Sequence, residues 1–298
     1  MSIFLLLASA KTTINNGTGS ALFAGGNPGI TTTSLYNYAT NVTKAGTALA
    51  ATKYDHAGTG NTTLGIFGGG FGAGNTTTCL YTYSSNASST GTQLTTTNYQ
   101  LAAVGNATLA IFGGGNASAV TGQYTYSGNS VVAGTSLKAA RAGLMATGNT
   151  TVGIFGGGGS SASGTTDVYT YSGATVVAGT SLTNPVTVGA ACGNATIGIF
   201  GGGGSSMSSP STAVLTTTSY TYGTNAVAAG TNLGFATYWG AAAGNSTIGL
   251  FGSGSAANNT RTQIYTYATS AVTNGSVLTN AASQTAASSS NPGWSGTI

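Results

Sequence analysis

One sequence segment occurs six times in this chain. Each copy contains a short apolar run that ends in phenylalanine and is followed by glycine-rich sequence, usually Phe-Gly-Gly. The marker phenylalanines, which lie 43 to 51 residues apart, are Phe23, Phe67, Phe112, Phe155, Phe200 and Phe251. A fixed period of this length indicates one supersecondary unit that packs against its own copies. The repeat therefore constrains the architecture before any single residue is considered.

Three further signatures recur in every unit. After the glycines comes a variable Ser/Thr/Gly-rich stretch, then a Tyr-x-Tyr triplet, and then a Gly-Thr-x-Leu signature, such as 134–137, with serine for threonine in the last copy. About ten residues later a Gly-Asn pair opens the next unit. The triplets begin at Tyr36, Tyr81, Tyr124, Tyr169, Tyr220 and Tyr265. The Gly-Asn pairs end at Asn61, Asn106, Asn149, Asn194 and Asn245.

These runs are short, rich in β-branched and aromatic residues, and bounded by glycine or asparagine, which predicts strands. No segment carries a helical apolar period of useful length. In the fourth unit, strands are expected within 142–149, 150–158, 165–172 and 175–182. Side chains alternate along a strand, so both rings of each Tyr-x-Tyr triplet should share one face. Four antiparallel strands in about 45 residues are typical of a β-propeller blade.

The order of these signatures resembles the kelch repeat, a family that includes the central domain of galactose oxidase. In that family an inner strand leads to a second strand ending in a glycine doublet, then to an aromatic-bearing third strand and an outer fourth strand. The resemblance covers roughly residues 19 to 290 and implies an all-β propeller. One departure is clear, because kelch repeats usually carry a tryptophan on the fourth strand, where this chain has Gly-Thr-x-Leu.

The chain ends suggest how the ring closes. We expect one domain over 1–298: an outer strand and the first inner strand within 1–18, six repeats over 19–280, and closing strands within 281–298. Residues 1–7 resemble an outer strand, 12–16 an inner strand, 281–291 another inner strand and 294–298 a partial second strand. These segments favour seven blades, the last of them built from both termini. The alternative is six blades.

Charge is almost absent from the sequence. There are six Lys or Arg residues, two Asp or Glu and one His in 298 residues. With so few and such scattered basic residues, no nucleic-acid partner is expected. No stretch has the length and apolarity of a membrane span. The two cysteines lie at different points of non-adjacent repeats, which predicts free buried thiols rather than a disulfide.

The same scarcity argues against catalysis and against bound cofactors. Metal sites need clusters of His, Cys, Asp or Glu, and the copper site of galactose oxidase takes two histidines, whereas this chain has only His56. Sialidase-like propellers use an arginine cluster, and only Arg141 and Arg261 are present. Asp55 and Asp167 are the sole carboxylates available for the pair that glycoside hydrolysis usually needs. We therefore expect a non-enzymatic protein without metal or cofactor.

The most informative divergence between repeats lies just before each Gly-Asn pair, at the start of the inner strand. In a propeller this position borders one end of the central channel. Aromatic and polar groups that meet there are typical of a small-ligand or sugar-binding surface. The alternative is that they plug the channel or pair with each other, for example Lys53 or Arg141 with Asp55. The candidate ligand-binding residues are Lys53, Tyr54, Asp55, His56, Tyr99, Gln100, Arg141, Tyr238 and Trp239.

A second candidate surface is the loop that follows each Phe-Gly-Gly. It varies in length and carries Phe71, Asn116, Met207 and Asn258. Variable loops at one edge of a rigid scaffold suit partner docking.

Together these features predict a structural and recognition module at a virion surface or outside the cell. A phage virion or tail-fibre component that attaches to a host surface or glycan fits best. Its expected partners are other virion or surface-assembly proteins, further copies of itself and host glycans. One alternative is a glycosylated extracellular adhesin or matrix protein, since twelve Asn-x-Ser/Thr triplets occur. A sugar-active enzyme is the weaker alternative.

Overall fold

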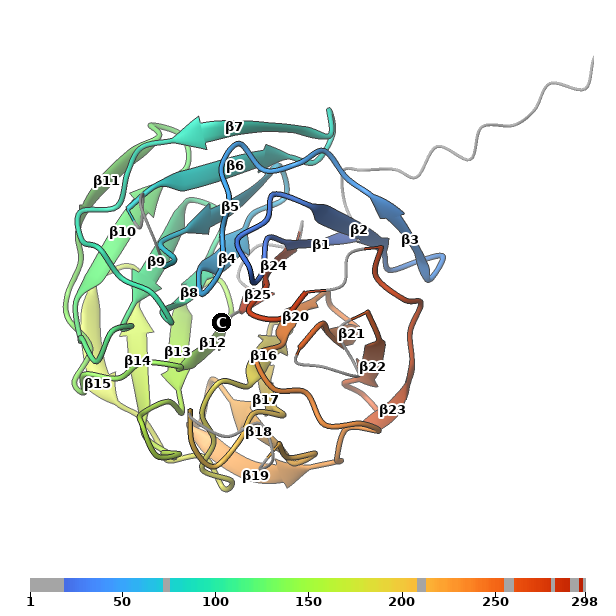
Figure 1. Ribbon diagram of the computed structural model, residues 1–298. Helices are drawn as coiled ribbons and strands as arrows, with labels where there is room; N and C mark the ends of the chain where they lie inside the picture. The colour runs from blue at the N-terminus through green and yellow to red at the C-terminus, as the bar shows by residue number, and fades with distance from the viewer. Residues whose placement is uncertain are drawn as a thin grey trace, which may run out of the picture.

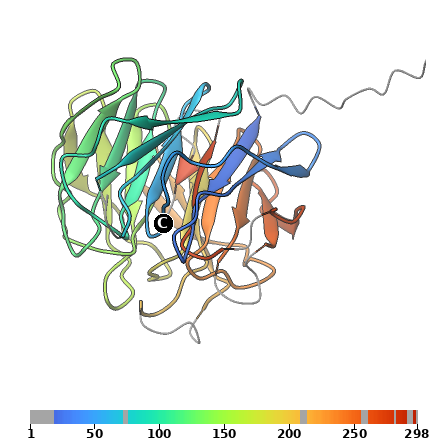
Figure 2. The same cartoon turned by 45° about the horizontal axis from the view of Figure 1, so that its top comes forward.

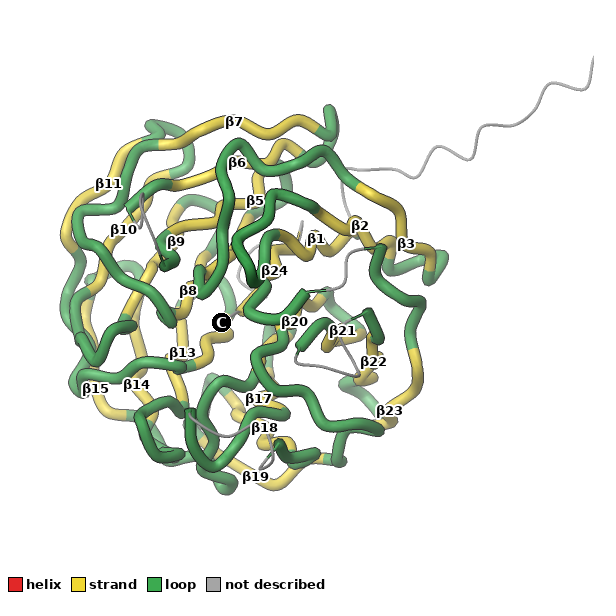
Figure 3. Tube along the Cα trace, viewed as in Figure 1, coloured by secondary structure: helices red, strands yellow, loops and turns green. Residues whose placement is uncertain are grey.

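The strands form six four-stranded antiparallel blades around a central channel. The computed structural model describes residues 19–71, 76–207, 213–254, 260–279, 282–289 and 295–296. Figure 1 looks along the channel, and in Figure 2 the blades are tilted so that their sheets are seen from the side. The described chain consists of strands and loops, without a helix (Figure 3). It contains no helix long and apolar enough to cross a bilayer.

Each blade runs from an inner strand beside the channel to an outer strand at the rim of the disc. The inner strands, taken from the first blade to the sixth, are β24 (Ala286–Ser289), β4 (Ala57–Gly60), β8 (Ala102–Gly105), β12 (Met145–Gly148), β16 (Ala190–Gly193) and β20 (Ala241–Gly244). The second strands are β1 (Ser20–Ala24), β5 (Leu64–Gly68), β9 (Leu109–Gly113), β13 (Val152–Gly156), β17 (Ile197–Gly201) and β21 (Ile248–Gly252).

The third and fourth strands carry the tyrosine triplets and the outer edges. The third strands are β2 (Thr33–Asn37), β6 (Thr78–Thr82), β10 (Thr121–Thr125), β14 (Thr166–Thr170), β18 (Thr217–Thr221) and β22 (Thr262–Thr266). The outer strands are β3 (Val42–Ala45), β7 (Ala87–Gly91), β11 (Ser130–Ala133), β15 (Thr175–Ala178), β19 (Ala226–Gly230) and β23 (Ala271–Asn274). The four strands predicted for the fourth repeat are confirmed as β12 to β15, each shorter than its predicted range.

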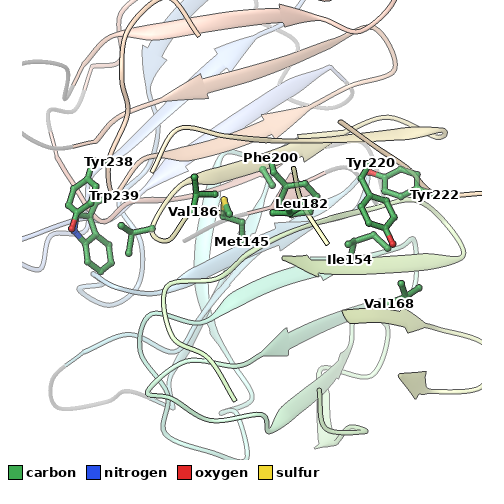
Figure 4. Packing of buried hydrophobic residues seen from close by; sticks show 12 residues of the cluster. Met145, Ile154, Val168, Leu182, Val186, Phe200, Tyr220, Tyr222, Tyr238 and Trp239 are labelled. Atoms are coloured by element: carbon green, nitrogen blue, oxygen red, sulfur yellow. The ribbon is translucent and has the colours of Figure 1, made fainter. Parts of the chain in front are cut away.

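The hydrophobic core lies between the blades rather than within them. It consists of six clusters between neighbouring blades, one of which also takes in Tyr238 and Trp239 from the start of the sixth blade. The marker phenylalanines, the first tyrosine of every triplet and the leucine of every Gly-Thr-x-Leu signature are all buried. Figure 4 shows the cluster between the fourth and fifth blades, which extends from Trp239 at one end to Tyr222 at the other. The signatures of the repeat are thus the contacts that join one blade to the next.

The ring closes with six blades, so the prediction of seven is wrong. The sixth repeat packs directly on the first, because one cluster combines Phe23 and Tyr36 with Leu250 and Leu278. The predicted inner strand at 281–291 exists as β24, but it pairs with β1 and completes the first blade. Both ends of the chain therefore contribute to that blade, and no seventh sheet separates it from the sixth.

The last described residues lie inside the channel. Strand β25 (Ser295–Gly296) pairs with β16 and β20 on its two sides and contacts all six inner strands. In Figure 1 it lies near the centre of the ring. The segment predicted as a partial second strand therefore contributes a channel strand instead. The strands predicted at 1–7 and 12–16 lie outside the described residues.

The two cysteines, Cys79 and Cys192, are free and buried, as predicted. Burial raises the pKa of the Cys192 thiol to about 12. At neutral pH this thiol is protonated and unreactive.

Candidate functional site

At the start of the inner strands, six equivalent residues form a ring around the channel, and backbone hydrogen bonds join five of its six neighbouring pairs. The residue two positions before β8 is Gln100, and its amide donates to the carbonyl of Asp55 in the preceding blade at 2.8 Å. The same bond runs from Gly143 to Gln100, from Val188 to Gly143, from Trp239 to Val188 and from Gln284 to Trp239, at 2.8 to 2.9 Å. The position predicted to border the channel is therefore a real junction between blades.

All six residues of this ring have a left-handed backbone, with φ between 50° and 65°. Only one of them is a glycine, Gly143. Side chains with a Cβ rarely adopt this conformation, so the ring holds strained residues such as Val188 and Trp239 in place. Its polar members, Gln284, Asp55 and Gln100, occupy three consecutive positions, in the first, second and third blades.

Asp55 is the acidic member of the ring. It is 5% exposed, and its Oδ1 has no hydrogen-bond partner among the described residues. Burial raises its pKa to about 6, while a hydrogen bond with the Gln100 side chain opposes the shift. Neither Lys53 nor Arg141 pairs with it, so the alternative in which these basic residues neutralise Asp55 is wrong.

Lys53 and Arg141 occupy equivalent positions and satisfy equivalent groups in their own blades. The Lys53 ammonium donates to the carbonyls of Gly69 and Thr77, at 2.8 and 2.6 Å. Arg141 Nη1 donates to the corresponding carbonyls of Gly157 and Thr165, at 2.7 and 2.5 Å. Burial lowers the pKa of Lys53 to about 8. Both cations are buried and bind carbonyls near the ends of the second and third strands.

Arg141 also forms an ion pair with Asp167. Asp167 is fully buried, and its other oxygen accepts the backbone amide of Lys138 at 2.9 Å. Burial lowers the pKa of Arg141, and the Asp167 carboxylate opposes that shift. Among the described residues this is the one ion pair.

Three more of the predicted residues are buried. His56 is fully enclosed beside Phe67, and burial together with the Lys53 charge lowers its pKa to about 3, so the imidazole is neutral at physiological pH. Tyr238 and Trp239 pack edge to face with ring centroids 5.8 Å apart. The Tyr238 hydroxyl donates to the carbonyl of Met207 at 2.7 Å and so supports the loop after β17.

The other predicted aromatic residues meet at the surface. Phe71, on the loop after β5, is 53% exposed and lies between Tyr54 and Tyr99, with ring centroids 5.6 and 5.2 Å away. The Phe71 amide donates to the Tyr54 carbonyl at 3.0 Å, which holds Phe71 at the rim. We call these three residues the aromatic triad. It joins the predicted rim to the predicted second surface.

A cavity of about 380 Å³ opens beside the triad. Tyr99 belongs to both. Asn116 and Ser160 are exposed in its wall, and neither side chain hydrogen-bonds to another described residue. The cavity spans the third, fourth and fifth blades, and its main lining residues are Tyr99, Gln100, Asn116, Arg141, Ser160 and Met207. We call it the rim cavity.

The structure thus brings together one subset of the predicted residues, namely Tyr54, Tyr99, Gln100 and Arg141, with Phe71, Asn116 and Met207 from the loops. Asn258 lies outside the described residues. Sequence reasoning missed Ser160 and the ring member Gln284. Gln284 occupies the position equivalent to Asp55 and Gln100, so the internal alignment of the repeats contained the signal for it.

The opposite face of the disc carries the Gly-Asn turns. Asn149 Oδ1 accepts the amides of Thr151 and Val152 at 2.9 and 3.0 Å, and its Nδ2 donates to the Ala195 carbonyl of the next blade at 3.0 Å. Asn61, Asn106 and Asn194 repeat this arrangement. The asparagine of these Asn-x-Thr triplets therefore closes a turn and joins two blades.

No three His, Cys, Asp or Glu side chains gather into a potential metal site within the described part of the chain. The two described carboxylates, Asp55 and Asp167, belong to different blades.

Comparison with known proteins identifies the fold alone. No family model matches the chain, and no curated protein matches its sequence. Among solved structures the chain is similar to that of YjhT, with a TM-score of 0.62 and 9% sequence identity. The match covers 79% of this chain and 87% of YjhT. At this identity the similarity supports a β-propeller and carries no information on activity.

Proposed function

We propose that this propeller is a non-enzymatic recognition module that binds glycans at the rim formed by the aromatic triad and the rim cavity. The observation that carries the proposal is the exposure of Phe71 between Tyr54 and Tyr99, beside a cavity with unpartnered polar side chains. Sugar rings offer an apolar face and a periphery of hydroxyls. Exposed aromatic faces next to a few polar groups suit such ligands.

The other large hollow lies on the opposite face and is less suitable. It has about 390 Å³ and is lined by Asn194, Thr196 and Tyr267, among others. Asn194 and Thr196 already hydrogen-bond to each other within their turn. The rim cavity is therefore the better-equipped site.

A non-enzymatic role is favoured by the carboxylates. Glycoside hydrolysis usually needs two carboxyl groups flanking the bond to be cleaved. Asp167 has both oxygens engaged and is fully buried. Asp55 is left without a catalytic partner among the described residues.

We further propose, from the kelch-like repeat and the low charge, that the module acts on a virion surface or tail fibre and serves host attachment. Further copies of the chain and other virion proteins are its expected neighbours. Antibody labelling of purified particles tests the location, and a signal confined to cell-surface fractions favours the adhesin alternative. Intact mass measurement tests the glycosylation that this alternative invokes.

Glycan-array binding with single variants tests the site. Phe71→Ala and Tyr99→Ala are expected to weaken binding at least tenfold without a change in thermal unfolding, because both side chains are partly exposed. Val177→Ala is the matched control, since Val177 on β15 is also 53% exposed but lies on an outer strand. Equal binding by the wild type and both triad variants would refute the rim as the binding site.

A further inference from the structure

Arg141 is the one charged residue that lines the rim cavity, and its charge is already neutralised by an ion pair. Arg141 is 5% exposed and forms its ion pair with Asp167, which is fully buried. The Asp167 oxygens are both occupied, by the guanidinium and by the Lys138 amide. The pair is therefore neutral as a unit, and both carboxylate oxygens already have partners.

The hydrogen-bond donors of Arg141 are also almost used up. A guanidinium has five N–H groups. Nη1 donates to the Gly157 and Thr165 carbonyls, and Nη2 to Asp167 and, at 3.5 Å, to the Phe155 carbonyl. Only the buried Nε lacks a partner. A bidentate clamp on a carboxylate or sulfate, which needs two free N–H groups on one edge, is not available.

Lys53, the other basic residue of the rim, also has all its hydrogen-bond donors engaged. Lys53 Nζ makes three hydrogen bonds, to the Gly69 carbonyl, the Thr77 carbonyl and the Thr77 hydroxyl, at 2.6 to 2.8 Å. An ammonium has three donors, so none remains. Lys138 is exposed but is not among the lining residues of the cavity.

One lining residue of the cavity contacts a negative charge that has no ionic partner among the described residues. Gln100 lines the cavity, and its side chain hydrogen-bonds with the Asp55 carboxyl, which has no ionic partner among the described residues. A buried carboxylate without a counter-ion repels a second anion through a medium that screens charge poorly. An acidic ligand would meet this repulsion, and no cation with two free donors lines the cavity to offset it.

We propose, on the basis of the glycan-binding function above, that the rim cavity selects neutral sugar residues and rejects acidic ones. A neutral hexose or N-acetylhexosamine would place its apolar face on Tyr99 and Met207. Its hydroxyl or amide groups would bond to Gln100, Asn116 and Ser160. Sugars bearing carboxylate or sulfate groups are excluded by the lack of a free cation and by Asp55.

Paired glycans test this selectivity. The wild-type protein is measured against oligosaccharides of identical backbone with and without a terminal carboxylated or sulfated sugar, at 50 and 500 mM NaCl. We expect at least tenfold weaker binding of the acidic member at low salt, and less than a twofold effect of salt on the neutral one, because no ion pair forms. Equal or tighter binding of the acidic glycan overturns the selectivity but leaves glycan recognition intact. Binding of neither class removes the proposed function itself.

Asp167→Asn adds a gain-of-binding test. It uncovers the Arg141 charge, so acidic glycans are expected to gain at least fivefold relative to neutral ones. Lys138→Gln is the matched control that removes an exposed charge nearby and should leave the ratio unchanged. A ratio unmoved in a folded Asp167→Asn protein, or shifted by Lys138→Gln, counts against the proposal. If Asp167→Asn does not fold, the paired-glycan comparison on the wild type decides.

Discussion

The ring of Phe112 packs over the α-carbon of Gly68 in the preceding blade. A methyl group added at Gly68 would lie 2.8 Å from Cε1 of Phe112. The same contact joins Gly113 to Phe155, Gly156 to Phe200, Gly201 to Phe251 and, across the closure, Gly252 to Phe23. At these five junctions the glycine directly after the marker phenylalanine therefore serves as the seat for the phenylalanine of the next blade, whereas the first blade has Ala24 at this position.

Gly68→Ala should destabilise the protein by about 1–3 kcal/mol, because a filled core accommodates an extra carbon only by moving its neighbours. The matched control is Gly122→Ala on β10, where the new methyl group would have no neighbour closer than 3.9 Å. Urea unfolding of both variants measures the difference. Similar midpoints for the two alanine variants would contradict the proposed seat.

A second prediction concerns the Gly-Asn turns. Asn149→Asp keeps the oxygen that accepts the Thr151 and Val152 amides but loses the donor to Ala195 in the next blade. The expected loss is about 1–2 kcal/mol, since a carbonyl loses its partner and faces a carboxylate. Asn149→Ala loses the turn contacts as well and should be less stable still. Thermal unfolding that ranks the alanine variant above the aspartate variant would reject this account.

The repeat made the blade predictable to the level of individual strands. Each signature of the repeat is buried in the same way in every copy. Phe155, Tyr169 and Leu137 could therefore be assigned to the core from spacing alone. The number of blades could not be derived in this way. It depends on which strand the 281–291 segment joins, and that choice is set by packing between Phe23 and the sixth repeat rather than by any local pattern.

The candidate site was predictable in position but not in orientation. The pattern correctly grouped Asp55, Gln100 and Trp239 as neighbours around the channel. It did not reveal that Lys53 and Arg141 turn back to the carbonyls of their own blades, because alternation along a strand does not apply in the loop before it. Gly143 was the one local sign that this position requires a left-handed backbone.

Acid should act on the protein through two opposed groups. The folded pKa of His56 is about 3, below its ordinary 6.5, so as the pH falls below 6.5 the unfolded chain takes up a proton that the folded chain does not, and stability falls. The folded pKa of Asp55 is about 6, above its ordinary 3.8, so stability rises as the pH falls from 6 to 3.8. Each slope is about 1.4 kcal/mol per pH unit, and the two nearly cancel between pH 6 and 4.

Single variants should separate these slopes. His56→Leu copies Leu101 and Leu144 at the equivalent position and should become more stable as the pH falls from 6 to 4. Asp55→Asn should become less stable over the same range. Chemical denaturation at pH 4, 5, 6 and 7 gives both slopes, and two flat profiles would show that neither group titrates as described.

The contribution of the Arg141–Asp167 ion pair to stability can be tested by replacing it with the uncharged residues that another repeat has at the same positions. The fifth blade has Val186 and Thr218 at the corresponding positions, without charge. Asp167→Thr alone leaves a buried guanidinium without its counter-ion and should cost about 3–5 kcal/mol. The double variant Arg141→Val, Asp167→Thr removes both charges and should recover most of that loss, because burying the pair already carries a desolvation cost. Denaturant midpoints of the wild type, the two single variants and the double variant complete the cycle. A double variant no more stable than Asp167→Thr would mean that the cost comes from lost packing around Arg141 and not from its unpaired charge.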